Sequence, residues 1–463
     1  MNKKSLFLTV LLYSLPILFF IVCYFLIITS GEDIHQGANT PPNIIQDSID
    51  AFNHSTRLAD MYAWSIINFF DYRFSFGPDT ILRLLDVTVA ISILYMMTYI
   101  ALARRPQLKL KDALIFNLCF LLVFLTQNGY TLYAGFSVIH NYLFMSFFSL
   151  LFSIFYIREL WGRPACPFRS IFLQKTFPFL MLILGFIFGF ASNVTPIVFL
   201  LTLPFYAIYL HLSKQKIHFK KFFFSWHTFS LLGVLAGLFF IYVVGHGLSD
   251  YQSSSDYVTT FDYLSLSDIF TSITSSIPRL FVHLVKNFGR FLLPFIIIFV
   301  PTAIITFKSR KRIKAPLFST KEKNFLIATI IFIFIHILAF TQIIYPTRLI
   351  LVAYLLAVSI TVFFLTRLFS SIRLRISITA TAIAFCSISI ALLTIRTYFA
   401  IDYLQQVSPV FDTIQSSTEN NICVDRSIIS PKSIPVVRLS QDAFLADWAM
   451  PQTIYGKNIS FCQ

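Results

Sequence analysis

The sequence predicts an all-α integral membrane protein with about 11 transmembrane helices. Of its 463 residues, 57% are hydrophobic and only 12% are charged, whereas soluble domains are roughly a quarter charged. The apolar residues gather in segments of about 20, the length at which a helix crosses the hydrocarbon and satisfies its own backbone. The basic residues gather in alternate loops between those segments. These observations together indicate a chain whose solvent is largely lipid.

The apolar segments set the order of the predicted helices. The first is longer than a signal-peptide core, so we expect it to be retained and not cleaved. The predicted spans, in chain order, are 5–30, 80–103, 113–130, 135–157, 176–192, 194–212, 226–245, 290–307, 324–345, 347–369 and 376–399.

The distribution of charge predicts the orientation, because Lys and Arg near span ends are retained in the cytoplasm. The amino terminus, alternate loops and Lys175 hold 24 of the 36 basic residues and only three of the 21 acids, Asp112, Glu159 and Glu322. We therefore expect a multi-pass protein of the bacterial inner (plasma) membrane, with a cytoplasmic amino terminus and an extracytoplasmic carboxyl terminus. The net charge of +15 then reflects topology, and we expect no nucleic-acid partner.

The predicted domain organisation has two parts. Residues 1–399 form a polytopic module with outer loops at 31–79 and 246–289. Residues 400–463 form a small extracytoplasmic region of continuing helix, short strands and turns. Cys423 and Cys462 both lie in this oxidising compartment and are predicted to form a disulfide. No spacing of Cys and His predicts a metal site.

The first outer loop opens with the acidic pair Glu32 and Asp33, followed closely by His35. Asp71 and Arg73 close the loop, next to aromatic residues typical of headgroup depth. A carboxylate here would accept the proton of an acceptor hydroxyl. The simpler interpretations are a solvated helix end for the acidic pair and an interfacial ion pair for Asp71 and Arg73. His35 would assist the acid or hydrate the loop.

The residue pattern of the second outer loop predicts an amphipathic helix on the membrane surface. Apolar residues recur at steps of three and four from Ile269 to Phe291, and a cationic stripe runs beside them. The stripe consists of Arg279, His283, Lys286 and Arg290. Its partner is either the lipid headgroups or the phosphate of a lipid-linked substrate.

Polar residues are scarce within the predicted spans. Ion-coupled transporters keep ionisable groups along a pathway, but His336 is the main group near mid-span, and we interpret it as a hydrogen-bonded packing residue. Asp86 and Arg348 fall near the outer surface. The Gly pairs at 185/189 and 233/237 are small-xxx-small patterns that predict close helix packing.

The layout resembles the GT-C superfamily of membrane glycosyltransferases, bacterial multi-pass enzymes that use polyprenyl-phosphate sugars. The stretches that carry the resemblance are "SGEDIHQ", "DYRF", "GFIFGFASNVTP" and "YPTRLI". Glu-Asp before Ile replaces the Asp-Asp before Tyr that is usual in an uncharacterised family of that type. The resemblance implies a GT-C-like fold, an inverting sugar transfer with Asp33 as general base and Glu32 beside it, and Arg348 near the departing phosphate.

The predicted function is transfer of a sugar or related group from a polyprenyl-phosphate carrier to an extracytoplasmic glycan, such as O-antigen lipopolysaccharide or a cell-wall polymer. Arg73, Arg279, Lys286, Arg290 and Arg348 are the candidate phosphate ligands. The sequence identifies no cofactor and permits a divalent metal, and the donor is a polyprenyl-phosphate sugar. Expected partners are membrane lipid, the lipid-linked donor, the glycan acceptor, a flippase and a polyprenyl-phosphate sugar synthase. The alternatives are a lipid-linked polysaccharide polymerase and a flippase or transporter of lipid-linked sugars.

Overall fold

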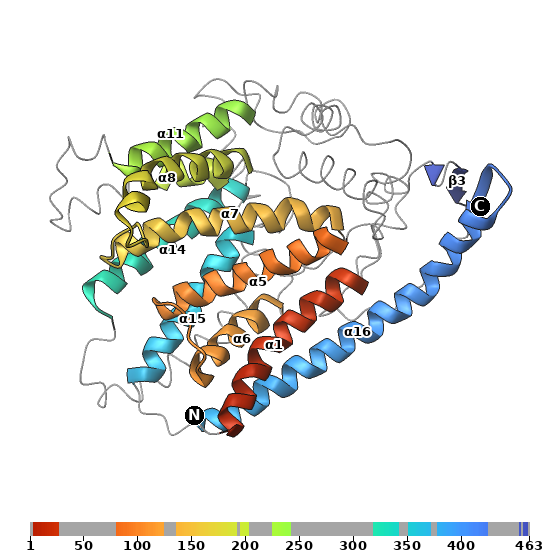
Figure 1. The fold of residues 1–463 in the computed structure, drawn as a ribbon, viewed down its shortest axis with the longest axis horizontal. Coiled ribbons are helices and arrows are strands. Elements are labelled where there is room, and N and C mark those ends of the chain that lie inside the picture. The colour runs from red at the N-terminus through yellow and green to blue at the C-terminus, as the bar shows by residue number, and fades with distance from the viewer. Residues whose placement is uncertain are drawn as a thin grey trace.

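The computed structural model is a helical bundle with a three-stranded sheet near the carboxyl terminus (Figure 1). It describes residues 3–26, 80–124, 136–191, 195–202, 225–241, 318–341, 351–371, 377–424, 453–454 and 457–461. The described helices are α1 (Lys3–Leu26), α5 (Thr80–Leu102), α6 (Leu110–Phe124), α7 (Phe136–Leu160), α8 (Ile171–Ala191), α11 (Trp226–Phe239), α14 (Thr320–Thr341), α15 (Leu351–Ser371) and α16 (Ile378–Ser416). The strands are β1 (Asn421–Val424), β2 (Thr453–Ile454) and β3 (Lys457–Phe461).

The helices confirm a multi-pass membrane protein. Six of them are long and apolar enough to cross a bilayer: α1, α5, α7, α8, α15 and α16. Predicted segment 290–307 and the outer loops 31–79 and 246–289 lie outside the described residues. The other predicted segments each overlap a helix, including 194–212, where residues 195–202 are helical.

Helix α15 is the centre of the bundle. It packs against α5, α6, α7 and α14, and residues 351–359 are buried at every position. A helix that is apolar on all sides is typical of such a central position. The Tyr354 hydroxyl donates to the Leu122 carbonyl at 2.9 Å, and the Thr366 hydroxyl donates to the Ala101 carbonyl at 3.3 Å. These bonds tie the beginning of α15 to the end of α6, and the last turns of α15 to the end of α5.

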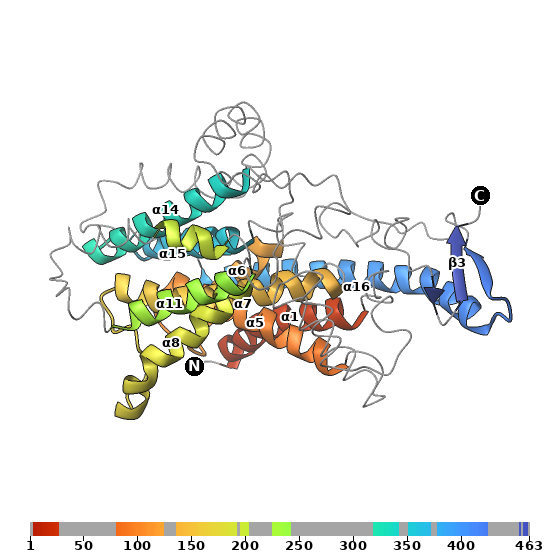
Figure 2. The same cartoon turned by 90° about the horizontal axis from the view of Figure 1, so that it is seen from above.

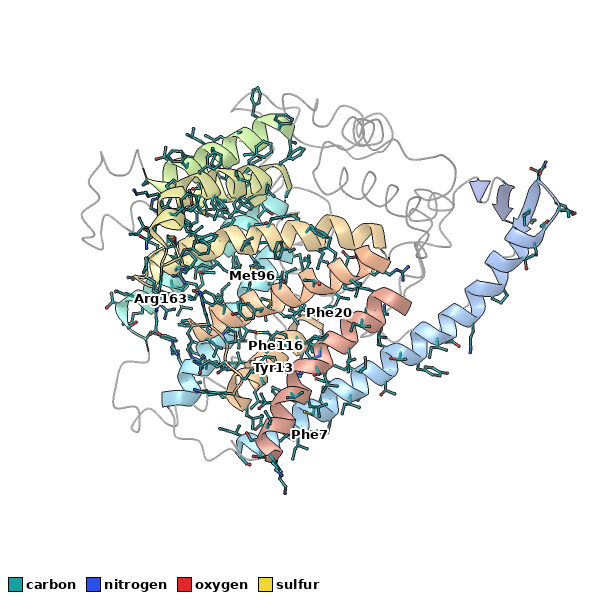
Figure 3. The ribbon with its side chains drawn as sticks, in the orientation of Figure 1. Phe7, Tyr13, Phe20, Met96, Phe116 and Arg163 are labelled. Atoms are coloured by element: carbon teal, nitrogen blue, oxygen red, sulfur yellow. The ribbon has the colours of Figure 1, made fainter. Side chains whose placement is uncertain are left out.

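Helices α1 and α16 pack side by side and run in the same direction (Figures 1 and 2). Asn117 of α6 joins them in the apolar interior. Its amide Nδ2 donates to the Leu12 carbonyl at 3.4 Å, and the Ser389 hydroxyl donates to its Oδ1 at 3.1 Å. The rings of Tyr13 and Phe116 meet between α1 and α6 with centroids 5.1 Å apart (Figure 3). One polar side chain thus fixes the register of three helices.

Helix α16 continues beyond its membrane-spanning part. Its apolar candidate span ends at Tyr398, but the helix runs unbroken to Ser416, which adds about 27 Å at 1.5 Å per residue. The predicted division at residue 399 therefore falls inside a helix. The sheet beyond it has the order β1-β3-β2, with β1 parallel and β2 antiparallel to β3.

Cysteine pairing is described for part of the chain. Cys423 of β1 is disulfide-bonded, whereas Cys23, Cys119, Cys166 and Cys386 are free. The predicted partner, Cys462, lies outside the described residues. The register of β1 and β3 places Ser460 opposite Cys423.

Helices α8 and α11 form the closest helix pair in the described structure, as the paired glycines predict (Figure 1). A Cβ atom at Gly185 or Gly189 would meet the backbone of α11, and one at Gly233 or Gly237 would meet the backbone of α8. Backbone cannot move aside as a flexible side chain does, so the four glycines set the distance between the two helices.

Replacing Gly189 with Leu should therefore separate α8 from α11. We expect a loss of about 1–3 kcal/mol or more, because overpacking a tight contact strains both helices. The readout is the temperature at which the detergent-solubilised protein loses its monodisperse size-exclusion peak. The matched control is Leu232→Ala on α11, because Leu232 is 53% exposed. If Gly189→Leu and the control lost the monodisperse peak at the same temperature, the role of Gly189 in α8–α11 packing would be contradicted.

Candidate functional site

The residues predicted for catalysis and phosphate binding lie outside the described structure. They are Glu32, Asp33, His35, Asp71, Arg73, Arg279, Lys286, Arg290 and Arg348. The chain nevertheless limits how far some of them can be from the bundle. In the sequence, Asp33 follows the last residue of α1 by seven positions, Arg73 precedes the first residue of α5 by seven, and Arg348 precedes the first residue of α15 by three.

Those three attachment points share one end of the bundle. The Arg83 guanidinium in the first turn of α5 donates to the Tyr24 carbonyl near the end of α1 at 2.7 Å. The Tyr354 bond described above places the start of α15 beside the end of α6. We call this the Asp86 end, after the buried acid found there. The structure thus brings together the points from which the chain leads to Asp33, Arg73 and Arg348.

Charged side chains are buried at the Asp86 end. Asp86 of α5 is fully buried, and Arg396 of α16 is 1% exposed. The Arg396 guanidinium lies close enough to the Cys23 thiol to interact with it electrostatically, and the Asp86 carboxylate interacts electrostatically with the adjacent Tyr24. Arg83, Asp86 and Arg396, with Cys23 and Tyr24, therefore form one cluster between α1, α5 and α16, which we call the buried charge cluster.

The buried charge cluster is the candidate functional site. Removing ions from water costs several kcal/mol each even when they are paired, so charged groups inside membrane bundles usually serve a pathway or a substrate. Sequence alone does not identify Arg396, because a single Arg near the end of an apolar segment is typical of an interfacial residue. The helix continues past Arg396 to Ser416, as the sequence predicts, but the burial of Arg396 depends on contacts between distant parts of the chain.

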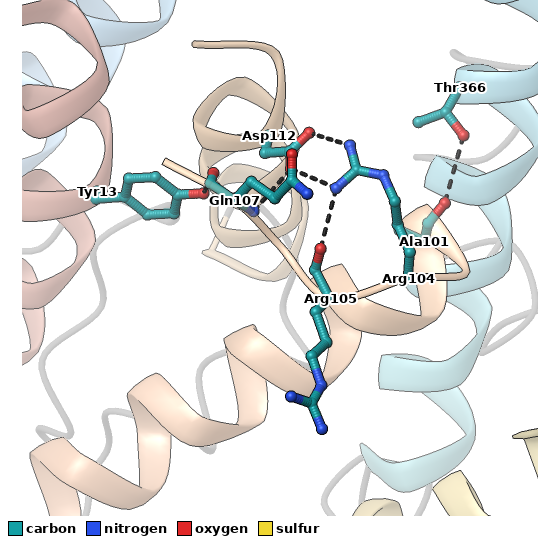
Figure 4. A network of polar contacts seen from close by, with 7 residues as sticks. All are labelled: Tyr13, Ala101, Arg104, Arg105, Gln107, Asp112 and Thr366. Carbon is teal, nitrogen blue, oxygen red and sulfur yellow. Dashed lines mark hydrogen bonds and ion pairs between the residues drawn. The ribbon is translucent and has the colours of Figure 1, made fainter. Parts of the chain in front are cut away.

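The opposite end of the bundle holds the predicted cytoplasmic loops, and we call it the basic end. Figure 4 shows its best-defined network, in which Arg104 forms two hydrogen bonds of 2.7 Å to the fully buried carboxylate of Asp112. The backbone N–H of Gln107 also donates to the Asp112 carboxylate at 2.8 Å, and the Tyr13 hydroxyl donates to the backbone carbonyl of Gln107 at 3.0 Å. The Asp112 carboxylate raises the pKa of Arg104 through this hydrogen bonding. Asp112 thereby fixes the α5–α6 loop.

The other two acids of the predicted cytoplasmic loops are paired as well. The Glu159 carboxylate lies 2.7 Å from His227 Nε2 and links α7 to α11. The Glu322 carboxylate lies 2.6 Å from Arg367 Nε and links α14 to α15. All three acids therefore connect helices at the basic end.

The structure confirms the prediction that His336 is a hydrogen-bonded packing residue. It is fully buried, and its Nε2 lies 3.2 Å from the Thr195 hydroxyl, which joins α14 to the helical segment 195–202. Its ring also contacts Phe332, with centroids 5.7 Å apart.

The described residues hold no group of three or more His, Cys, Asp or Glu side chains arranged to bind a metal ion. In comparisons with protein-family models, curated proteins and solved structures, no match to this chain was found. The fold and buried groups therefore define the class, a multi-pass helical membrane protein, and the activity must be argued from the site.

The Glu322–Arg367 pair predicts acid sensitivity at the basic end. Burial acts to raise the pKa of Glu322, but hydrogen bonds from Ser319 and the Arg367 guanidinium together lower it. The pair therefore stabilises the protein fully above the ordinary value of 4.5, and this contribution is lost as the pH falls through the lowered pKa.

In Glu322→Gln, the melting temperature should fall less than in the wild type as the pH is lowered from 6 to the acid limit of folding. The measurement is the melting temperature of the purified protein across that range. Glu419→Gln is the control, because Glu419 is exposed beyond α16. An unchanged acid dependence in Glu322→Gln would contradict the assignment.

Proposed function

We propose that the chain is an enzyme that transfers a sugar or related group from a polyprenyl-phosphate carrier to an extracytoplasmic glycan. The observation that carries the proposal is the buried charge cluster at the Asp86 end. Two cations and one carboxylate lie there between α1, α5 and α16, at the end where the chain leads into the acidic loop. The resemblance to GT-C enzymes in "SGEDIHQ" and "YPTRLI" supports the same reaction.

The proposed mechanism divides acid–base and electrostatic work between two groups of residues. The Asp33 carboxylate, with Glu32 beside it, takes the proton of the acceptor hydroxyl as its oxygen attacks the anomeric carbon. The bond from that carbon to the phosphate oxygen breaks on the opposite face, which inverts the configuration. Cations stabilise the negative charge on the departing phosphate. Arg348 is the proposed first ligand, and Arg73, Arg279, Lys286 and Arg290 are further candidates.

The cations of the cluster favour an anionic ligand at this end. A guanidinium in an apolar bundle is stabilised by an anion nearby. A lipid-linked donor brings such an anion, together with an apolar tail that the surrounding bilayer accommodates. A divalent metal is compatible with this step, although the adjacent carboxylates Glu32 and Asp33 alone are a poor cation site.

Asp33→Asn should abolish the modification, because the amide cannot accept the proton. The measurement is mass spectrometry of surface glycans from cells with the wild-type gene, the Asn variant or no gene, at equal membrane abundance. We expect a sugar-sized mass increment in the wild type alone. Full modification by Asp33→Asn would exclude Asp33 as the base.

The same experiment distinguishes the alternatives. A polymerase would change the length distribution of the polymer without changing the mass of its repeat unit. A flippase would change the sidedness of the lipid carrier, and Asp33→Asn would leave that transport mostly intact. Either result in the gene deletion would replace the transferase proposal.

Arg396→Gln should lower transfer about tenfold or more, because it removes a buried cation from the cluster. The assay is sugar transfer in isolated membranes, normalised to the amount of folded protein by size exclusion. Arg105→Gln serves as the control, since Arg105 is exposed at the basic end. If folded Arg396→Gln protein keeps full activity, the cluster has a structural role alone.

A further inference from the structure

A chain of three hydrogen-bonded side chains at the basic end has no part in the proposed sugar transfer. The Ser225 hydroxyl lies 3.1 Å from His227 Nδ1, and His227 Nε2 lies 2.7 Å from the Glu159 carboxylate. Glu159 is 68 positions from His227 in the sequence, so the packing of α7 against the start of α11 assembles the chain. A hydroxyl, an imidazole and a carboxylate in this order can activate a serine nucleophile, and here the two ring nitrogens are exchanged relative to the Ser-His-Asp triad.

The contacts fix the imidazole in the tautomer that such a role requires. A carboxylate at 2.7 Å from Nε2 favours the proton on that nitrogen, which leaves Nδ1 to accept from the Ser225 hydroxyl. The ring is held by Trp226, stacked on it with centroids 3.9 Å apart, and by the edge of Tyr156 at 5.9 Å. The side chains of His227 and Glu159 are 14% and 25% exposed, so the chain is shielded but not sealed from solvent.

Ser225 occupies a position where a serine side chain normally accepts a hydrogen bond from the helix backbone. It is the N-cap of α11, with extended backbone angles, and its side chain makes no capping hydrogen bond. An N-cap hydroxyl typically stabilises a helix by accepting a hydrogen bond from a backbone N–H of its first turn. Ser377, the N-cap of α16, accepts from the Ala380 amide as expected. Ser225 instead directs its hydroxyl to the imidazole.

The location of Ser225 next to an exposed apolar helix face indicates which class of substrate would reach its hydroxyl. Ser225 precedes the first residue of an apolar helix, and the next turns of α11 expose Leu232 at 53%, Leu235 at 46% and Phe239 at 55%. Those side chains suit contact with lipid acyl chains, which places Ser225 near the depth of the ester groups of a glycerolipid. The positive end of the α11 dipole also lies there and favours a developing oxyanion.

We propose that Ser225, His227 and Glu159 form a second site, which cleaves a carboxylic ester of a membrane lipid. The Ser225 Oγ bonds to the ester carbonyl carbon while its proton passes to His227 Nδ1. The bond from that carbon to the lipid alcohol oxygen breaks, and the alcohol leaves with the proton from the imidazole. Water then cleaves the acyl-serine by the same proton route, which releases the carboxylic acid and restores Ser225. Glu159 orients the imidazole and stabilises its protonated form.

The test is covalent labelling of the purified full-length protein with a fluorophosphonate, which reacts with activated serines. We expect an adduct on Ser225, located by mass spectrometry of proteolytic fragments, and hydrolysis of a short-chain p-nitrophenyl ester at a rate above the detergent blank. Absence of an adduct on Ser225, under conditions in which a known serine hydrolase labels fully, would overturn the proposal.

Variants separate an activated serine from a merely structural tether between α7 and α11. His227→Gln should lower the labelling rate of Ser225 at least tenfold, and Glu159→Gln should lower it to a smaller extent. Ser377→Ala is the matched control, because it removes an N-cap hydroxyl without a histidine partner, and it should label as the wild type does. Labelling of Ser225 at an unchanged rate in both His227→Gln and Glu159→Gln would overturn the proposal, even if these variants melted earlier.

Sugar transfer and ester cleavage are tested independently. The buried charge cluster lies at the Asp86 end, and Ser225 lies at the basic end. Ser225→Ala should therefore leave the glycan mass increment unchanged, whereas Asp33→Asn should leave the fluorophosphonate adduct in place.

Discussion

The structure depends on the free energy of taking charge out of water. A long apolar bundle satisfies its backbone within each helix, but it has no solvent for an ionised side chain. The three acids of the predicted cytoplasmic loops each meet a basic partner or a histidine at the basic end. Between the ends, the helices are joined by neutral groups such as Asn117 and His336. At the Asp86 end, the side chains of Asp86 and Arg396 are buried within the bundle, and this burial of charge makes the cluster the candidate site.

Hydropathy and glycine spacing predicted much of the described fold, because both are local properties of the chain. The spans around α1, α5 and α15 follow from apolar length alone. The contact of Gly185 and Gly189 with α11 follows from a pattern that only small residues allow. The extension of α16 was also predicted, since "IDYLQQVSPVFDTIQ" continues an apolar helix with no break.

The two sites depend on contacts between distant parts of the chain, and these the sequence could not reveal. Arg396 resembles an interfacial residue until α1 and α5 are packed around it. Glu159 belongs to a predicted cytoplasmic loop and His227 to a predicted span, and their contact requires the α7–α11 packing. Asp33 and Arg348, in contrast, were proposed from position and resemblance, and both lie outside the described residues.

Helix α16 is continuous from its membrane-spanning part to the residues just before the sheet, so a small tilt at its base moves its far end by a larger distance. A helix of about 58 Å, at 1.5 Å per residue, converts a tilt of about 5° at its base into a displacement of about 5 Å at its tip. Pro409 lies in the outer part and removes one backbone hydrogen bond there, so bending concentrates beyond Arg396. The strand that carries the disulfide-bonded Cys423 thus follows the same helix that carries the buried arginine.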